Sequence, residues 1–356
     1  MSPLAEEIAL LIRQTGPIGV DRYMSLCLGH PVHGYYRTRD PLGARGDFTT
    51  APEISQMFGE LIGLWIAAVR GMMDPAARPL LVELGPGRGT LMADALRALG
   101  SVLPDGQVDL HLVETSPPLR AAQAAALARF RPTWHEDPAD LPDGPAIVIA
   151  NEFFDCLPVR QFARTERGWC ERLVGLAPEG GLGFGLAPDP EPGIRAEAPP
   201  GALMTLPAAG LSVMRALAAR LARAGGALLL IDYGHVAPGF GDTLQALARH
   251  RFVDPLAEPG EADLTAHVDF AALARAAQGE GARVHGPVTQ RDFLMDLGLL
   301  ARAERLTRSA DPAQAAAIAT AVARLTDPAE RGMGHLFKVM AIGSPDLAQL
   351  PGLPAR

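Results

Sequence analysis

The chain of 356 residues lacks most features of a secreted or membrane-spanning protein. Its three cysteines, Cys27, Cys156 and Cys170, are far apart and odd in number, so we expect reduced thiols and no disulfide framework or zinc site. No apolar run reaches the roughly 18 residues of a spanning helix, so no membrane insertion is expected. The start, MSPLAEEIALLIRQTG, has two glutamates and no basic stretch, unlike a secretory signal. These absences predict a cytoplasmic protein.

Positive charge is also scarce. The chain has 32 Lys and Arg against 40 Asp and Glu, which gives a formal net charge of −8. General nucleic-acid binders usually carry a basic surface, so we expect no nucleic-acid partner, although a basic protein partner stays open. Apolar residues make up 48% of the chain and charged residues 20%, which is enough to build a sizeable core.

Short apolar strands alternate with amphipathic helices from about residue 80 onward. The predicted strands are 79–84, 107–114, 133–137, 145–151, 226–232, 282–288 and 335–343. The predicted helices are 4–14, 117–129, 208–224, 268–280, 291–306 and 312–325, with another after Thr50, whose spacing to Glu53 fits a capping box. This alternation predicts an α/β fold with a doubly wound, mostly parallel sheet that helices cover on both faces.

A glycine-rich loop follows the first of these strands. The stretch ELGPGRGT (83–90) places glycines at Gly85, Gly87 and Gly89. A dinucleotide fingerprint needs G-x-G-x-x-G, and Thr90 occupies the position of its third glycine. A Walker loop needs a lysine that this loop does not have. The spacing therefore argues against both ligands, and the alternative that the loop is only a tight turn stays open.

Two carboxylates accompany the loop. Glu83, two residues before the first glycine, would repel a pyrophosphate and attract a cationic ligand. An acidic residue followed by G-x-G-x-G is a pattern of S-adenosylmethionine (AdoMet) binding, and AdoMet carries an ammonium and a sulfonium. Glu114 ends the second predicted strand, where a carboxylate can accept both hydroxyls of a ribose. Alternatively, Glu114 is an acidic residue at a helix start, because ETSPP follows.

A second acidic cluster, NEFFD, begins at the end of the strand predicted over 145–151. Asn151, Glu152 and Asp155 are expected to lie over the reactive end of the cofactor, next to the first strand at the switch point of the sheet. Methyl transfer requires the acceptor about 3–3.5 Å from the methyl group. Carboxylates suit a guanidinium acceptor because they bind it bidentately and help to manage its proton. The alternative is an Asn-capped helix start with acidic first-turn residues.

Four more residues are assigned to the acceptor and one to the cofactor. His267 and Asp269 resemble a metal pair, but with no third ligand in view we expect no metal and place them at the acceptor site. Asp232 and Tyr233, at the end of the strand predicted over 226–232, join them. Asp137, at the end of the strand predicted over 133–137, is assigned to the cofactor.

Taken together, several stretches resemble the MidA-like methyltransferases, a family that includes an arginine-methylating assembly factor of mitochondrial complex I. They are GDFTTAPEISQMFGELIGLW, LVELGPGRGTLMADALRAL, NEFFDCLPVRQF, LLIDYG, GDTLQALARHRFVDPLAEPGEADLTAHVDF and GMGHLFKVMAIG. They run in family order from about residue 20 to 343, so the resemblance covers nearly the whole chain. GDFTTAPEIS and DPLAEPGEADLTAHVDF are far more specific than the glycine loop.

The resemblance implies a class I AdoMet-dependent methyltransferase fold with a seven-stranded sheet. It implies that Gly85, Gly87 and Gly89, with Thr90, form the cofactor loop, that Asp47, Phe48 and Thr49 form a lid, and that Asn151 and Glu152 lie at the active-site strand end. Cys156 stands where a small residue such as alanine is expected, and we predict that it packs. We expect a helical N-terminal segment over 1–75 with a lid loop at 34–55, and a Rossmann-like methyltransferase domain over 76–345 with inserts at 156–207 and 241–263. A tail follows at 346–356.

The sequence therefore predicts an AdoMet-dependent methyltransferase that acts on arginine in a protein, with a respiratory complex I subunit as the candidate substrate. With no mitochondrial presequence in view, we expect a bacterial member, whose acceptor can differ from the mitochondrial one. Three alternatives stay open: a non-catalytic assembly factor that binds AdoMet, a small-molecule methyltransferase, and an NAD-dependent oxidoreductase. The oligomeric state is not predicted.

Overall fold

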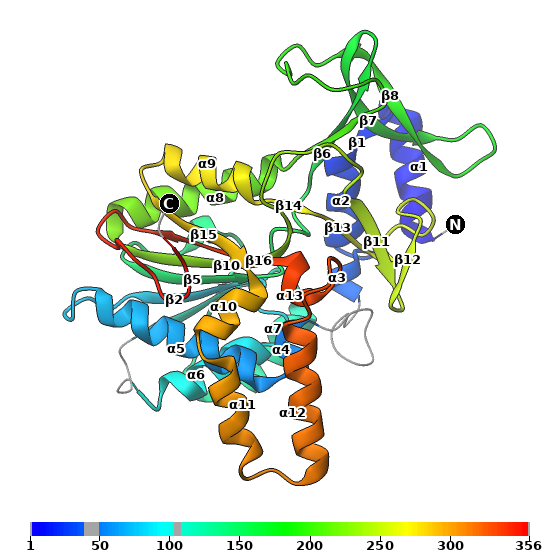
Figure 1. Ribbon diagram of the computed structural model, residues 1–356. Coiled ribbons are helices and arrows are strands. Elements are labelled where there is room, and N and C mark those ends of the chain that lie inside the picture. The colour runs from blue at the N-terminus through cyan, green and yellow to red at the C-terminus, as the bar shows by residue number, and fades with distance from the viewer. Residues whose placement is uncertain (1, 39–49, 103–107, 355–356) are drawn as a thin grey trace. The chain divides into compact units, whose positions relative to one another are not determined.

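A computed structural model describes residues 2–38, 50–102 and 108–354 (Figure 1). The chain forms two compact units, each assembled from three segments. Unit 1 comprises Met1–Phe48, Phe154–Ser212 and Ala237–Asp269, and unit 2 comprises Thr49–Phe153, Val213–Val236 and Phe270–Arg356. Both predicted inserts thus belong to unit 1, together with the first part of the expected N-terminal segment, whereas the rest of that segment belongs to unit 2.

Unit 2 is built on a sheet that contains all seven predicted strands. In spatial order they are β15 (Arg283–Thr289), β16 (Phe337–Gly343), β10 (Gly226–His235), β5 (Ala146–Asn151), β2 (Leu80–Leu84), β3 (Asp109–Val113) and β4 (Thr133–His135). The strands from β10 to β4 are parallel, and β16 is antiparallel to both its neighbours. All seven strands predicted from the sequence are thus present in one sheet, and the prediction that this sheet is mostly parallel is confirmed.

Helices cover both faces of this sheet. In Figure 1, α8 and α9 lie above the strands, and α5 and α6 lie below them. The helices are α4 (Ala51–Ile54), α5 (Gln56–Met72), α6 (Thr90–Leu99), α7 (Pro117–Ala126), α8 (Ala208–Ala224), α9 (Phe270–Gly279), α10 (Gln290–Asp296), α11 (Leu299–Thr307), α12 (Pro312–Leu325) and α13 (Met333–Leu336), with 3-10 turns at Ala128–Phe130 and Pro138–Asp140. Every residue of β2 and β5 is buried, as expected for strands covered on two faces.

Two predicted helices of unit 2 are each interrupted. The helix expected after Thr50 is split into α4 and α5 because Ser55 adopts an extended backbone and caps α5 through its hydroxyl, which accepts from Met57 N at 3.2 Å. The predicted capping box is therefore wrong, and Thr50 makes no side-chain cap. The helix expected over 291–306 is split into α10 and α11 by Gly298, whose φ of 90° suits glycine and ends a helical path.

Unit 1 combines helices with two antiparallel sheets. The helices are α1 (Pro3–Thr15), α2 (Val20–Gly29) and α3 (Tyr35–Thr38). One sheet has the order β1 (Ile18–Gly19), β7 (Gly168–Leu176), β6 (Arg160–Thr165) and β9 (Leu203–Leu206), with β8 (Leu182–Pro190) paired to β7. The other has the order β12 (Arg251–Val253), β11 (Leu244–Ala248) and β13 (Asp263–Ala266), and the short β14 (Val268–Asp269) follows.

The sequence underestimated the regular structure of unit 1. The alternating pattern of residues 160–176 predicts a hairpin, which is present as β6 and β7. The irregular pattern of residues 234–263 predicts no strands, but this stretch contains β11 and β12. The proline-rich stretch 187–201 starts inside β8, which among the described residues pairs only with β7, and prolines are tolerated on such an edge strand. The loop expected over 34–55 has helical ends, α3 and α4.

The core of unit 1 lies between the apolar faces of α1 and α2 and the two sheets. Leu4 and Ile8 of α1 are buried with Tyr23 and Met24 of α2. Cys156 packs against this cluster, as predicted. In the described part of the chain, none of the helices combines the length and the apolar character needed to cross a membrane.

Candidate active site at the carboxyl ends of the unit 2 strands

The candidate site of unit 2 lies where the strand order reverses. β2 pairs with β3 on one side and with β5 on the other, and both pairings are parallel, so the three strands end at the same edge. Glu83 is level with Leu112 of β3 and with Ile149 of β5. In open α/β sheets, ligands bind outside the carboxyl ends of the strands at such a switch point.

The glycine loop turns sharply between β2 and α6. Gly85, Gly87 and Gly89 have φ values of 60°, 54° and 84°, all in the left-handed region that favours glycine. The loop is anchored by a hydrogen bond from Gly85 N to Val113 O at 3.0 Å. The N-cap residue of α6 is Gly89, which has no side chain to cap the first N–H groups of the helix.

Gly85 is also sterically confined, which leads to a testable prediction. A Cβ atom at Gly85 would lie 3.1 Å from Cδ2 of Phe153. We expect Gly85→Ala to destabilise the protein by about 1–3 kcal/mol, because backbone strain adds to crowding, and to weaken S-adenosyl-homocysteine binding, measured by chemical denaturation and calorimetry. Gly298→Ala is the matched control, since Gly298 has a positive φ but open space around it. An equal loss of binding in both variants would contradict a specific role for Gly85.

Glu83 is a deeply buried carboxylate at the carboxyl ends of these strands. Its side chain is 3% exposed, and among the described residues its Oε2 atom has no hydrogen-bond partner. Burial raises the pKa of Glu83 to about 8. A buried carboxyl group in this state is stabilised by an incoming cation, so the position suits a ligand with a positively charged group.

Glu114 follows β3 directly and is held by the protein on both oxygens. Oε1 accepts from Ser116 N at 2.7 Å and Oε2 accepts from Gln123 Nε2 at 3.2 Å. Burial raises the pKa of Glu114, and these hydrogen bonds oppose that effect. Ser116 is the N-cap of α7, so the two sequence interpretations of Glu114, a strand-end carboxylate and an acidic residue at a helix start, describe one place.

Two contacts of the glycine loop were missed by the sequence analysis. Thr90 Oγ1 donates to Glu53 Oε1 at 2.7 Å, so the side chain that was expected to close a capping box binds the start of α6 instead. Gln123 Nε2 donates to Gly87 O at 2.7 Å. A signal for the second was present, because Gln123 and Arg120 are the polar residues of an alanine-rich helix and lie three apart on one face.

Asn151 is the last residue of β5, which pairs with β2, and Glu152 follows it. Asn151 Nδ2 donates to Glu152 Oε1 at 3.1 Å, and Glu152 N donates to Ile231 O at 2.9 Å. Glu152 has a φ of 51°, which is costly for a residue with a Cβ atom and points to a functional constraint. The alternative interpretation from the sequence, a helix that starts at Asn151, is wrong, because no helix begins between β5 and β6.

The other candidates of unit 2 lie on neighbouring elements. Asp232 is fully buried in β10, beside β5, and its Oδ1 accepts from Tyr233 N at 2.9 Å. The Tyr233 ring packs against Phe337 at 5.5 Å. Asp137 is exposed and caps the turn Pro138–Asp140 by accepting from Ala139 N at 2.8 Å. The assignment of Asp137 to the cofactor stays a prediction.

Three candidates belong to unit 1. Asp155 is buried, and its carbonyl oxygen accepts from Ala266 N at 2.8 Å. His267 Nε2 is 3.3 Å from Gln245 Nε2, and Asp269 ends β14. The proposed lid residues Asp47, Phe48 and Thr49 lie outside the described residues. In the described segments, no three His, Cys, Asp or Glu side chains come together in a group that could hold a metal ion.

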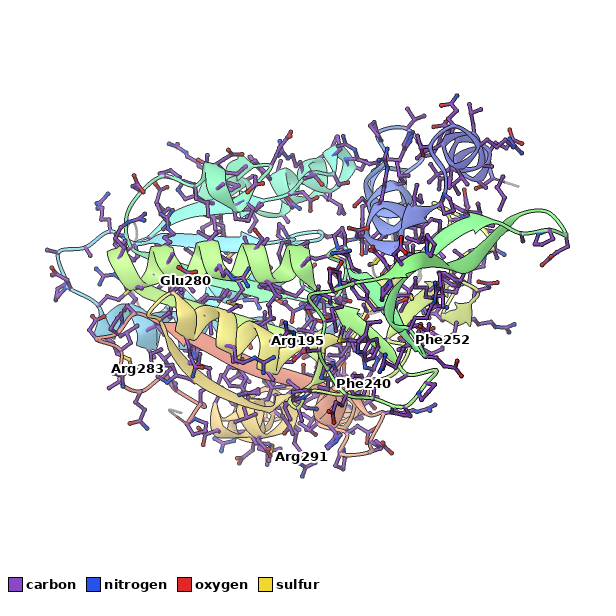
Figure 2. The ribbon with its side chains drawn as sticks, turned by 90° about the horizontal axis from the view of Figure 1, so that it is seen from above. Arg195, Phe240, Phe252, Glu280, Arg283 and Arg291 are labelled. Atoms are coloured by element: carbon purple, nitrogen blue, oxygen red, sulfur yellow. The ribbon has the colours of Figure 1, made fainter. Side chains whose placement is uncertain are left out.

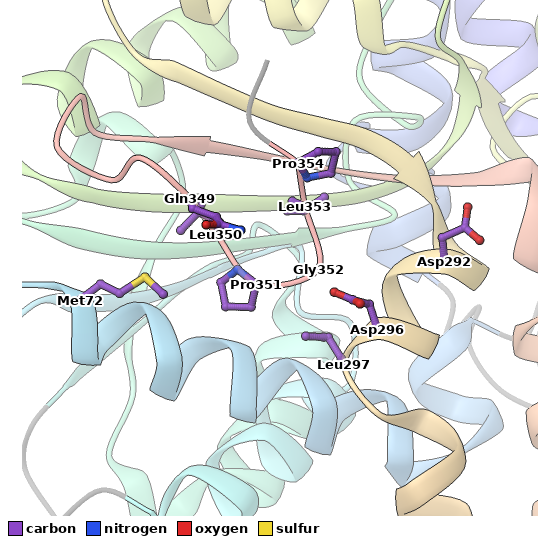
Figure 3. A pocket seen from close by; sticks show the side chains of 10 residues that line it. All are labelled: Met72, Asp292, Asp296, Leu297, Gln349, Leu350, Pro351, Gly352, Leu353 and Pro354. Atoms are coloured by element: carbon purple, nitrogen blue, oxygen red, sulfur yellow. The ribbon is translucent and has the colours of Figure 1, made fainter.

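A separate groove of about 620 Å³ lies in unit 2 (Figure 3). The C-terminal segment 349–354 forms one wall, and Met72, Asp292, Asp296 and Leu297 complete the lining. None of the residues that the sequence assigned to cofactor or acceptor lines this groove, so it is not the site at the strand ends.

The fold and the strand-end site together define a class I AdoMet-dependent methyltransferase. The sheet has the strand order of this fold, with one antiparallel strand. At its strand ends, three glycines have positive φ values and Glu83 is buried. These features suit a cofactor with a ribose and a cationic group. Residues 61–288 match the model of the family described as "Putative S-adenosyl-L-methionine-dependent methyltransferase". The chain belongs to this family, and its cofactor is AdoMet.

Known relatives agree over nearly the full length. The chain is 39% identical to the mitochondrial protein arginine methyltransferase NDUFAF7 of Mus musculus, over 96% of this chain and 84% of that protein. It is 37% identical to the Homo sapiens protein of the same name, over 96% and 83%. A crystal structure of a Burkholderia thailandensis protein with bound S-adenosyl-homocysteine has a TM-score of 0.83 at 32% identity and covers 98% of this chain and 93% of that one.

Proposed function

We propose that this methyltransferase transfers the methyl group of AdoMet to an arginine side chain of a protein. The observation that carries the proposal is the similarity, over 96% of this chain, to relatives named protein arginine methyltransferases. Glu152, a carboxylate on a strained backbone beside the glycine loop strand, supports it. A guanidinium is planar and permanently charged, and a carboxylate is its best-matched partner among side chains.

In this proposal the cofactor is held by the glycine loop and the two carboxylates. The loop over Gly85, Gly87 and Gly89, with Thr90 behind it, brings backbone close to the cofactor. Glu83 faces its cationic amino acid part, and Glu114 accepts the ribose hydroxyls. Bound AdoMet supplies a methyl group activated by its sulfonium. Asp137 and the segment Asp47–Thr49 are proposed as further cofactor contacts.

The acceptor side is proposed to contain Glu152, Asn151 and Asp155, with Asp232, Tyr233, His267 and Asp269 as further contacts. Glu152 binds the guanidinium and takes the proton that the methylated nitrogen loses. Asn151 holds the Glu152 carboxylate through its amide, which donates to Oε1 at 3.1 Å. This pair orients the reacting nitrogen, which is the main task in a displacement reaction.

Exposed apolar side chains on unit 1 support a protein rather than a small molecule as substrate. β12 is an edge strand of its sheet, and Phe252 in it is 74% exposed, with Val253 also exposed (Figure 2). An exposed aromatic residue on a strand edge is a typical contact for another protein chain.

A subunit of respiratory complex I is the first candidate for the protein substrate, because the resemblance to the MidA-like family suggests it. The test is mass spectrometry of complex I subunits from cells with and without this chain. We expect one arginine to lose one or two methyl groups when the chain is deleted and to regain them on complementation. Unchanged arginine methylation across complex I would exclude this substrate and direct the search to other proteins.

A further inference from the structure

Gln123 is a buried polar residue that links three parts of the cofactor region. It lies on α7 with no exposed surface. Its Nε2 atom donates to Gly87 O at 2.7 Å and to Glu114 Oε2 at 3.2 Å, and its Oε1 atom accepts from Trp134 Nε1 at 2.8 Å. One side chain therefore contacts the glycine loop, the carboxylate after β3 and strand β4.

The orientation of this amide is fixed by its partners. The indole N–H of Trp134 can only donate, so it requires the Gln123 oxygen on its side. Gly87 O and the Glu114 carboxylate can only accept here, so they require the amide nitrogen. Both polar atoms of the Gln123 amide are used, and a flipped amide would leave all three partners mismatched.

We propose that Gln123 is a positioning residue for the cofactor, which holds the ribose-binding carboxylate of Glu114 at a fixed place relative to the glycine loop. The inference rests on the proposed function, in which Glu114 accepts the ribose hydroxyls. Ser116 N and Gln123 Nε2 each hold one oxygen of Glu114, so the plane of the carboxylate is set before the cofactor arrives.

Because Gln123 also binds Gly87 O in the glycine loop, its role extends beyond the support of the Glu114 carboxylate. Gln123 also packs against Gly89, where a Cβ atom would lie 3.5 Å from Gln123 Cα. The glycine loop and the Glu114 carboxylate are thus both held by Gln123. Groups that are preorganised in this way bind a ligand at a lower entropic cost than mobile ones. A glutamine that only filled space would not need to bind both Gly87 O and Glu114.

Calorimetry with S-adenosyl-homocysteine and its 2′-deoxy and 3′-deoxy analogues tests the proposal. For the wild-type protein, we expect each missing hydroxyl to weaken binding by about 10- to 100-fold, as hydrogen bonds to a charged group do. In Gln123→Met, of similar length without hydrogen-bonding groups, we expect this penalty to fall below about 5-fold. A merely structural role would lower the affinity for all three ligands equally and leave the penalty unchanged.

Gln290→Met is the matched control. Gln290 is also a fully buried glutamine of unit 2, it donates to Leu325 O at 3.0 Å, and it follows β15 at the far end of the strand order. It should lose stability but keep the wild-type hydroxyl penalty. If Gln123→Met does not fold, Trp134→Phe replaces it, because this change keeps an aromatic ring while it removes the donor that fixes the amide, and it should reduce the penalty to a smaller extent.

The outcomes distinguish the positioning role of Gln123 from the cofactor site itself. An unchanged hydroxyl penalty in Gln123→Met, or in Trp134→Phe where the former is unfolded, overturns the positioning role while leaving the cofactor site intact. A wild-type protein that binds S-adenosyl-homocysteine with no hydroxyl penalty overturns both this role and the assignment of Glu114. A wild-type protein that does not bind S-adenosyl-homocysteine overturns the proposed cofactor site itself.

Discussion

Glu152→Gln should slow methyl transfer by about 10²- to 10⁴-fold and leave S-adenosyl-homocysteine affinity within about threefold of wild type. The glutamine keeps the shape of the side chain but loses the charge that binds the guanidinium and the base that takes its proton. The measurement is single-turnover methyl transfer to the substrate protein, with calorimetry for the cofactor. Glu280→Gln is the matched control. Glu280 is an exposed carboxylate that precedes the first residue of β15 and is thus distant from the carboxyl ends of the strands.

This result would also decide between catalysis and a purely structural role in assembly. A non-catalytic assembly factor would tolerate Glu152→Gln in cells, because its fold and cofactor affinity are kept. We expect the opposite: complementation of a deletion strain by the variant should fail whenever methylation of the substrate arginine is lost. Full function in cells without detectable methylation would sink the catalytic proposal.

A second substitution at Glu152 separates function from stability. Its φ of 51° costs a residue with a Cβ atom about 1–2 kcal/mol, whereas glycine adopts it freely but loses about 0.5–1 kcal/mol through the entropy of the unfolded chain. Glu152→Gly should therefore be as stable as wild type or up to about 1.5 kcal/mol more stable, yet inactive. A clear loss of stability would show that the carboxylate supports the fold rather than the chemistry.

The sequence predicted the sheet of unit 2 well, because strands buried on both faces leave continuous apolar runs between turn residues. It failed where a single residue changes the path of the backbone, as Ser55 does between α4 and α5 and Gly298 between α10 and α11. Two strands of unit 1, β8 and β12, were missed for another reason. Every residue of β12 is exposed and β8 contains prolines, so neither shows the alternation that marks a half-buried strand.

For the candidate site, the sequence located the strand-end residues but not their connections. Gly85, Glu114 and Glu152 follow strands, so their common edge can be inferred from the order of elements. The contacts from Glu53 to Thr90 and from Gln123 to Gly87 join residues more than 30 positions apart. Such pairs depend on how helices pack on the sheet, which no local pattern encodes.

Glu83→Gln should stabilise the unliganded protein at alkaline pH by several kcal/mol. The folded state holds Glu83 at a pKa of about 8, against an ordinary value of 4.5, because burial disfavours its charged form. At a pH between these two pKa values, the unfolded chain has released the Glu83 proton while the folded chain still holds it. The free energy of unfolding therefore falls as the pH rises. The loss approaches at most about 5 kcal/mol above pH 8, and a glutamine does not incur it.

Denaturant unfolding of the unliganded protein between pH 5 and pH 9 measures this effect as the difference between wild type and variant. Other groups titrate in the same range, and the difference cancels them. Glu60→Gln is the matched control, because Glu60 is also buried but is paired with Arg97 and Arg302. In Glu60→Gln, the free energy of unfolding should fall with rising pH as much as it does in the wild type. Parallel stability curves for wild type and Glu83→Gln would contradict the raised pKa.

The same carboxylate should make cofactor binding depend on pH in the opposite direction. A cationic group beside Glu83 lowers its pKa, so binding below pH 8 releases a proton, and the wild-type advantage over Glu83→Gln should grow as pH rises from 6.5 to 8. The ratio of the two affinities removes the titration of the ligand's own amine. We expect the ratio to increase by about tenfold. A ratio that stays constant across this range would place Glu83 away from the cation. Its burial would then destabilise the folded state without strengthening cofactor binding.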